Sequence, residues 1–161
     1  MKTAKDLRKQ LKDELGLNSR QVSVRSDSCS IHVTIKVPAP KSPIEAIAKT
    51  AESIDRCEYS GEILSGGNTY VSVTYAEGIL ESYAKSVLGE SVTAEVVEAL
   101  KATPGKTLEL PGGYDVFYLD IYYHVTKVGH SDYPHPTRTY GGREALNLYA
   151  ERLLEDRAAA S

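Results

Sequence analysis

The sequence predicts an α+β fold, in which a mostly antiparallel sheet has helices packed on one of its faces. Two observations lead to this class. Several segments of the 161-residue chain alternate apolar and polar side chains, which is the pattern of a half-buried strand. Between them lie segments with the apolar spacing of an amphipathic helix. The predicted order is α-β-β-α-β-α-α-β-β-α in a single domain, 1–161, for which 1–76 and 77–161 are candidate sub-units.

The first helix is predicted over residues 3–15 by its cap and its apolar stripe. Thr3 at the cap and Asp6 at the third helical position form a capping box, and leucines follow at every fourth position. Two alternating segments, 20–25 and 30–37, come next. Only a short polar turn (SDSCS) joins them, so they predict an antiparallel hairpin.

The second helix is predicted to begin at Ser42, because three start signals coincide there. Ser42 supplies a cap, Pro43 suits the first helical position, and Glu45 suits the third. Its apolar face extends to Ile54. A Gly-Gly loop then precedes a third alternating strand, 68–75.

The second half is predicted to contain helices at 78–88 and 92–102, strands at 106–110 and 114–128, and a last helix at 142–157. A Pro-Gly-Gly turn joins the two strands. In the longer strand the odd positions are expected in the core and the even positions outside it. The odd set is Phe117, Leu119, Ile121, Tyr123 and Val125, and the even set is Tyr118, Asp120, Tyr122 and His124.

Composition limits the classes of function. A net charge of -3 is too small for strong non-specific DNA binding or for a DNA mimic. No apolar run is long enough for a membrane span, and the charged N-terminus lacks a signal-peptide core, so a cytoplasmic location in a host cell is expected. Cys29 and Cys57 are expected as reduced thiols, with Cys29 buried. Neither a P-loop nor a dinucleotide motif occurs, and no cofactor is expected.

About the first 80 residues resemble a known family. The leading helix KDLRKQLKDELG, the hairpin VSVRSDSCSIHVTIKV, a Pro-capped helix and the strand NTYVSVTY are similar to large polyvalent protein-associated domains of phage and conjugative-element proteins. The function of that family is unassigned. The resemblance implies a mobile-element origin and work near host defence or DNA transfer, and it implies no catalytic residues.

The polar side of the sheet is the first candidate site. Period-two geometry places the polar side chains of each strand opposite the helices. An open face with tyrosine rings and cations is typical of base-stacking platforms and also of subunit or partner interfaces. A plain solvated face is the third alternative. The candidate binding residues on this face are Arg25, His32, Lys36, Tyr70, Tyr118, Tyr122 and His124. Because eleven of the twelve aromatic residues are tyrosines, we expect most aromatic surface at a boundary rather than in the core.

The polar loop 129–141 holds the other candidates. His130, Asp132 and His135, with His124 upstream, are residue types that bind zinc and other transition metals. An ordinary polar loop and acid–base chemistry are the alternatives. At its end, Arg138, Tyr140 and Arg143 surround two glycines before a helix, which suits anion binding.

The sequence therefore favours a non-enzymatic binding protein, because no catalytic motif is present. Such an inhibitor is expected to act against host defence by binding a host protein, or to sequester a nucleotide, and a homodimer through the sheet face is an alternative assembly. A nucleic-acid-binding accessory protein that uses the Tyr-rich face is the alternative function. A small metal-dependent hydrolase built on the four-residue histidine cluster is the second alternative.

Overall fold

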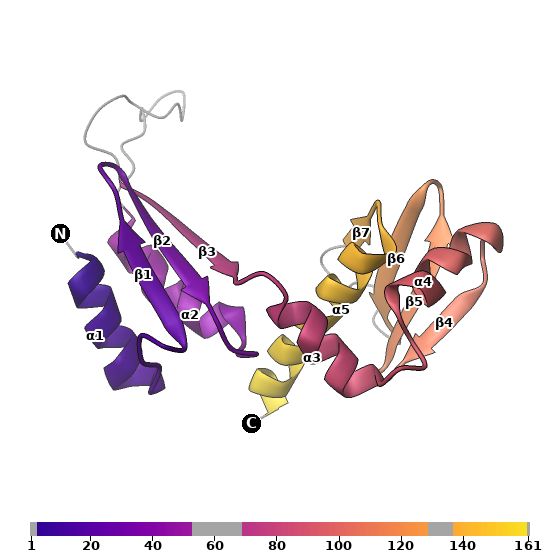
Figure 1. Cartoon of the computed structure of the whole chain (residues 1–161), viewed down its shortest axis with the longest axis horizontal. Coiled ribbons are helices and arrows are strands. Elements are labelled where there is room, and N and C mark those ends of the chain that lie inside the picture. The colour runs from indigo at the N-terminus through magenta and orange to yellow at the C-terminus, as the bar shows by residue number, and fades with distance from the viewer. Residues whose placement is uncertain (1–2, 53–68, 129–136, 161) are drawn as a thin grey trace. The chain divides into compact units, whose positions relative to one another are not determined.

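The computed structural model describes residues 3–52, 69–128 and 137–160 and confirms an α+β fold in which most strand pairs are antiparallel (Figure 1). The strands form two sheets, not the single one that was predicted. Each sheet belongs to one of two compact units, Met1–Glu77 (unit 1) and Gly78–Ser161 (unit 2). That the chain acts as one domain stays a prediction. None of the described helices has both the length and the apolar composition needed to cross a membrane.

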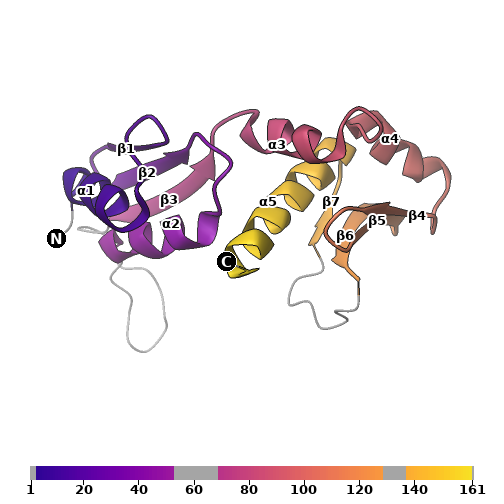
Figure 2. The same ribbon diagram turned by 90° about the horizontal axis from the view of Figure 1, so that it is seen from below.

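Unit 1 is a three-stranded sheet with two helices on one face (Figure 2). Strands β1 and β2 form the expected antiparallel hairpin, and β3 pairs with β2 in parallel. Apolar side chains from both helices and all three strands form one core. The elements are α1 (Ala4–Leu15), β1 (Val22–Ser26), β2 (Ser30–Ile35), α2 (Lys41–Ala48), a 3-10 helix (Lys49–Ala51) and β3 (Tyr70–Tyr75).

Local signals explain most of unit 1. The capping box of α1 is confirmed, since the Asp6 amide donates to Thr3 Oγ1 at 3.2 Å and the Thr3 amide donates to Asp6 Oδ2 at 2.9 Å. The second helix is different, because Pro40 occupies its N-cap position without a side-chain bond and Ser42 lies inside the helix. Ile54, Cys57 and the Gly-Gly loop lie outside the described residues.

Both edges of the unit 1 sheet are covered by charged side chains. Arg8 of α1 donates to the Val24 carbonyl of β1 at 2.6 Å. At the other edge, Lys49 Nζ donates to the Val71 carbonyl at 2.8 Å, and the Val71 amide donates to Glu52 Oε2 at 3.2 Å. Covering an edge strand in this way prevents it from pairing with another chain.

Unit 2 is a four-stranded antiparallel meander with strand order β4-β5-β6-β7. Helix α5 packs against α3, α4 and the strands β6 and β7. Strand β7 lies where the sequence predicted only a loop. The elements are α3 (Ile79–Leu88), α4 (Ala94–Glu98), a 3-10 helix (Ala99–Ala102), β4 (Thr107–Leu110), β5 (Tyr114–Leu119), β6 (Tyr122–Lys127), β7 (Thr137–Thr139) and α5 (Gly142–Ala160).

Two glycines allow close packing around α5. A Cβ added at Gly142 would lie 2.9 Å from the Ala94 carbonyl oxygen and 3.0 Å from the Glu98 amide nitrogen of α4. Gly112, in the predicted Pro-Gly-Gly turn, has φ +89°, and a Cβ there would lie 2.6 Å from Leu153 Cδ1. Gly142 therefore faces α4 and not an open anion site.

Three tyrosines lie in the core of unit 2, so the expectation that tyrosine gathers at boundaries is only partly correct. Each of their hydroxyls has a partner: Tyr149 donates to the Pro111 carbonyl at 2.6 Å, Tyr123 to the Glu98 carbonyl at 3.2 Å, and Tyr114 to Asp156. Burial raises the pKa of Tyr149 to about 12.

Candidate functional site: an aromatic patch on the second sheet

The turn between β5 and β6 decides which side chains of unit 2 lie on the face away from the helices. Asp120 and Ile121 have φ values of +53° and +66°. Two consecutive left-handed residues between paired strands form a type I′ hairpin turn. The predicted single strand over 114–128 is therefore two strands, and the alternation restarts after the turn.

This reversal corrects the predicted core. Of the five odd positions expected there, Tyr123 and Val125 are buried. Leu119 and Ile121 are instead 46% and 66% exposed. Phe117 pairs with His124 of β6 and shares its outer face.

The even positions, all expected outside the core, also lie on different sides of the sheet. Tyr118, a predicted binding residue, packs against the buried core, because it lies on the helix-facing side of β5. Asp120 lies in the turn. Tyr122 and His124 occupy the outer face, where the sequence placed them.

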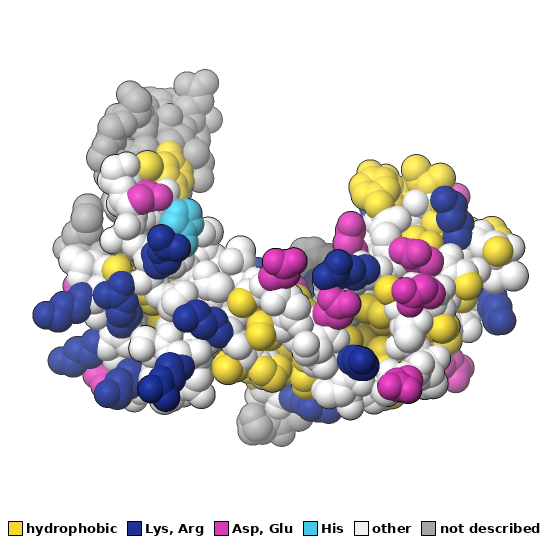
Figure 3. All heavy atoms as spheres, in the orientation of Figure 1, with side chains coloured by type: hydrophobic (Ala, Val, Ile, Leu, Met, Phe, Trp, Pro, Cys, Tyr) yellow, Lys and Arg dark blue, Asp and Glu magenta, His cyan; other side chains and the backbone are white. Residues whose placement is uncertain are grey.

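Aromatic and apolar side chains gather on the outer face of β5, β6 and β7 and at the β5–β6 turn. Figure 3 shows hydrophobic side chains at the turn end of this hairpin. The register places Arg138 of β7 beside His124 of β6. We call this surface the aromatic patch; it consists of Phe117, Leu119, Ile121, Tyr122, His124, Arg138 and Tyr140.

Neighbouring rings of the patch contact one another across the strands. Phe117 and His124 stack with centroids 5.0 Å apart and planes 10° apart. The Tyr122 and Tyr140 rings lie 4.9 Å apart, with their hydroxyl oxygens at 3.3 Å. The Arg138 guanidinium carbon lies 4.6 Å from the Tyr122 ring centroid, so a cation–π contact completes the group. These side chains therefore hold one another in place.

Hydrogen bonds fix the polar atoms of the patch. His124 Nε2 lies 3.0 Å from the Leu119 carbonyl oxygen. A carbonyl only accepts, so Nε2 carries the hydrogen and Nδ1 is left as the acceptor in neutral histidine. The hydrogen bond with Tyr122 raises the pKa of Tyr140, which keeps that phenol protonated. The patch therefore presents packed rings beside one arginine.

The outer face of unit 1 is polar by comparison. Arg25, His32 and Ser72 form one cross-strand row, and Ser23, Thr34 and Thr74 form the next. Along these strands the alternate positions are buried, so the predicted alternation is confirmed. The other predicted binding residues here are Lys36, which donates to the Ser19 carbonyl at 3.5 Å, and Tyr70, which is exposed at the start of β3.

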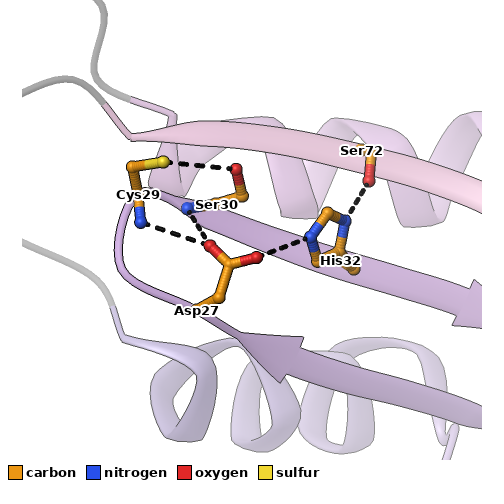
Figure 4. A network of polar contacts seen from close by, with 5 residues as sticks. All are labelled: Asp27, Cys29, Ser30, His32 and Ser72. Atoms are coloured by element: carbon orange, nitrogen blue, oxygen red, sulfur yellow. Dashed lines mark hydrogen bonds and ion pairs between the residues drawn. The ribbon is translucent and has the colours of Figure 1, made fainter.

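A chain of polar contacts crosses this face (Figure 4). His32 Nδ1 lies 2.9 Å from Ser72 Oγ, and His32 Nε2 lies 3.2 Å from Asp27 Oδ2. Asp27 also accepts from the amides of Cys29 and Ser30, at 3.2 and 2.9 Å. The Cys29 bond and then the His32 contact hold the pKa of Asp27 below its usual value. Cys29 itself is exposed, not buried as predicted.

The serine, histidine and aspartate in this chain do not form a convincing nucleophilic site. Catalytic triads hold a buried acid and place the serine beside free donors for an oxyanion. Here the His32 and Asp27 side chains are 52% and 58% exposed. The amide of Val71, next to Ser72, is already bonded to Glu52. We therefore interpret the network as a tie between the β1–β2 turn and β3.

The structure does not gather the remaining predicted site residues. Arg143 turns away from the patch and pairs with Glu81 of α3 at 2.8 Å, and Gly142 is packed against α4. His130, Asp132 and His135 lie outside the described residues. Among the residues that are described, no group of three or more His, Cys, Asp and Glu side chains could hold a metal ion.

Sequence reasoning missed Phe117, Leu119 and Ile121 as surface residues, although one signal was available. The predicted strand over 114–128 is longer than the usual three to ten residues of a strand. Its length alone favoured a turn near the middle, where Asp120 tolerates the left-handed conformation. The sequence analysis carried one alternation of inward and outward positions through this turn. It therefore placed these three residues in the core and left them out of the candidate sites.

The comparisons with known proteins assign no family to this chain: no family model, curated protein or solved structure matches it.

Proposed function

We propose that the protein is a non-enzymatic binding protein that recognises a protein partner through the aromatic patch. The observation that carries the proposal is Ile121. A β-branched residue in the left-handed region costs about 1–2 kcal/mol of backbone strain. Its side chain is largely exposed and recovers little of that cost by burial. A strained, exposed apolar residue at a hairpin turn is best explained by a contact that it makes with something else.

The composition of the patch supports a protein as the partner. Tyrosine, phenylalanine and arginine are enriched in the centres of protein interfaces. The rings are already packed on one another, so little side-chain freedom is lost on association. Arg138, whose guanidinium lies over the Tyr122 ring, would offer its donors to a carboxylate of the partner.

Charge argues against nucleic acid on the same surface. Arg138 is the basic residue of the patch, whereas Glu109 and Asp115 face each other across β4 and β5 on the same outer face. Residues 78–161 hold 12 acidic and 8 basic side chains. A phosphate backbone needs several cations in line, and here it would meet carboxylates. An open sheet face also lacks the concave shape that encloses a small nucleotide.

The resemblance of the first 80 residues to domains of phage and conjugative-element proteins supports a host defence protein as the partner. The patch lies in the other half of the chain, so this part of the proposal is independent of its geometry. A protein of this kind would act as an inhibitor by occupying a surface of its target, without chemistry of its own.

The test compares three baits in quantitative affinity capture from host lysate, followed by reconstitution with each purified candidate. The baits are the wild type, the patch variant Ile121→Ser with Tyr140→Ser, and a control variant on unit 1, Tyr70→Ser. We expect a protein that wild type and control retain equally and that the patch variant loses by about tenfold or more in dissociation constant, as for two interface anchors.

Two results would contradict the proposal. One is a purified partner that binds the patch variant as tightly as the wild type. The other is salt-dependent binding of an oligo(dT) or a nucleotide that disappears in Tyr122→Ala with Tyr140→Ala, which would assign the patch to base stacking.

A further inference from the structure

We propose that the outer edge of β4 binds a short extended segment of a protein partner that carries a lysine or arginine opposite Glu109. This inference rests on the proposed function, because it names the kind of segment that the partner brings to unit 2. The sheet order makes β4 an edge strand, and Figure 2 shows it as the outermost strand of this sheet. Adding a strand to an exposed sheet edge is a recurring way of binding an extended peptide.

Two backbone hydrogen bonds fix the direction of the backbone groups along β5. In an antiparallel sheet, successive residues of a strand bond alternately to the neighbour on one side and to the neighbour on the other. The Gly113 carbonyl, just before β5, accepts from the Val128 amide at 2.7 Å, so the odd-numbered residues of β5 bond towards β6. The Tyr118 carbonyl accepts from the Gly105 amide at 3.2 Å, so the even-numbered residues bond towards β4.

The free backbone groups of β4 therefore belong to Thr107 and Glu109. Leu108 lies opposite Val116, an even-numbered residue, and so bonds to β5. The N–H and C=O groups of its two neighbours consequently point away from the sheet. Thr107 and Glu109 are both exposed, and no residue in the described part of the chain bonds to these outward groups. They form the template that an added strand needs.

This edge differs from the edges of unit 1. There, Arg8 bonds to one edge strand, and Lys49 and Glu52 bond to the other. On β4 the free edge is open but short, because Pro111 follows the strand and has no N–H to offer. An added segment can pair only along 107–109, so it binds weakly unless the same partner also contacts the surface beside it.

The aromatic patch is that neighbouring surface. Thr107 lies opposite Phe117, in a cross-strand row that continues through His124 to Arg138. The side chain of Thr107 therefore lies on the same outer face as the patch. A partner segment paired with β4 extends this face by one strand, so one partner can cover both.

Two carboxylates decide which strand suits the edge that the backbone defines. Glu109 lies directly opposite Asp115 on the outer face, and neither has an ion pair with another described residue. Like charges directly opposite each other destabilise a sheet, whereas an opposite charge beside them stabilises it. A second copy of β4 would add two more carboxylates to this face. The charges therefore favour a foreign segment with a basic residue at this position.

The experiment is an NMR titration of the full chain with two pentapeptides, acetyl-TVKVT-amide and acetyl-TVEVT-amide, which differ only in the central charge. We expect saturable shifts of the Thr107 and Glu109 amide signals with the lysine peptide, which should bind about fivefold more tightly than the glutamate peptide. Glu109→Lys should reverse this preference.

A backbone variant tests the pairing itself. Thr107→Pro removes one outward N–H, and it should fold because proline is tolerated on the solvent side of an edge strand. It should weaken binding of the lysine peptide about fivefold. Thr107→Val, which keeps the N–H and the branched side chain, is the matched control and should bind as the wild type does.

Three results would overturn the proposal. They are the absence of saturable shifts at Thr107 and Glu109 with either peptide up to ~10 mM, equal affinity for both peptides in the wild type and in Glu109→Lys, and unchanged binding in Thr107→Pro. Wild-type dimers in sedimentation velocity that disappear in Thr107→Pro would instead assign the edge to a second copy. The patch variant Ile121→Ser with Tyr140→Ser should bind the lysine peptide normally, so a failure of the partner proposal is distinguishable from a failure of the edge.

Discussion

The two units use their exposed sheet faces differently. In unit 1 the outer face is polar, His32 bonds to both Ser72 and Asp27 on it, and both sheet edges are covered by charged residues. In unit 2 the outer face carries stacked rings, exposed leucine and isoleucine, and a strained turn. A face whose polar groups are satisfied internally is stable in water alone, whereas an exposed apolar face is typical of an interaction surface.

The contrast also separates two roles of tyrosine within unit 2. Tyr114 and Tyr123 of the sheet and Tyr149 of α5 are buried with every hydroxyl bonded, so they belong to the core. Tyr122 and Tyr140 bond mainly to each other on the outer face. The same residue type thus fills the core in one layer and lies on the outer face in the other.

The largest expected effect tests this division. Tyr149→Ala should lower the free energy of unfolding by about 3–5 kcal/mol, because it leaves a cavity and an unpaired Pro111 carbonyl. Tyr140→Ala, on the patch, should change it by less than about 0.5 kcal/mol. Urea denaturation followed by circular dichroism measures both. A loss of comparable size in Tyr140→Ala would make the patch structural and would remove its claim to a partner.

The next effect concerns the covered edges of unit 1. Lys49→Ala with Glu52→Ala removes both side chains that bond the outer edge of β3, and it should cost about 1–3 kcal/mol. The freed edge should also pair with a second copy, so sedimentation velocity should show concentration-dependent dimers. Lys41→Ala with Glu45→Ala, which removes an ion pair on α2, is the matched control. Its sedimentation coefficient should equal that of the wild type at every concentration. Identical sedimentation of the two variants would show that the edge needs no cover.

Ile121→Gly should change stability and partner binding in opposite directions. Glycine adopts the left-handed region freely, so the variant should be more stable than the wild type by about 1 kcal/mol, measured by urea denaturation. The same change removes the exposed side chain and should weaken partner binding. Ile121→Ser retains the backbone strain and should weaken binding without the gain in stability. A stabilised Ile121→Gly variant with undiminished binding would leave the strain without a functional reason.

Local signals predicted unit 1 well. Thr3 and Asp6 bond as a capping box regardless of the rest of the chain, and the alternation through Ile31 and Val33 fixes which face of β2 is buried. The start of α2 was misplaced by two residues, because the helix begins after Pro40 without the side-chain cap that Ser42 was expected to supply. The parallel pairing of β3 needed tertiary information.

Unit 2 was harder to predict because its decisive features depend on contacts distant in sequence. The turn at Asp120 lacks the Asn-Gly or Asp-Gly pair that marks a type I′ hairpin, so packing of the two strands holds it in place. Strand β7 has three residues, too few to show a period. Gly142 resembled an anion-binding glycine, but its proximity to α4 is visible only in the fold.

The smallest expected effect is a pH dependence at the β1–β2 turn of unit 1. The Cys29 amide and His32 hold the pKa of Asp27 below the ordinary aspartate value of 3.8. A carboxyl with a lowered folded-state pKa stabilises the fold above its unfolded-state pKa, and this stabilisation is lost as the pH falls through the folded-state pKa. We therefore expect the β1–β2 turn to loosen below about pH 4, seen as lower amide-exchange protection factors at Cys29 and Ser30, that is, exchange compared with the intrinsic rate at each pH. In Asp27→Asn those amides should lose this pH dependence, while the amides of Tyr122 and His124 in the patch should behave alike in both proteins. A pH response at Cys29 that persists in Asp27→Asn would locate the titrating group elsewhere and would weaken the view that this face is internally satisfied.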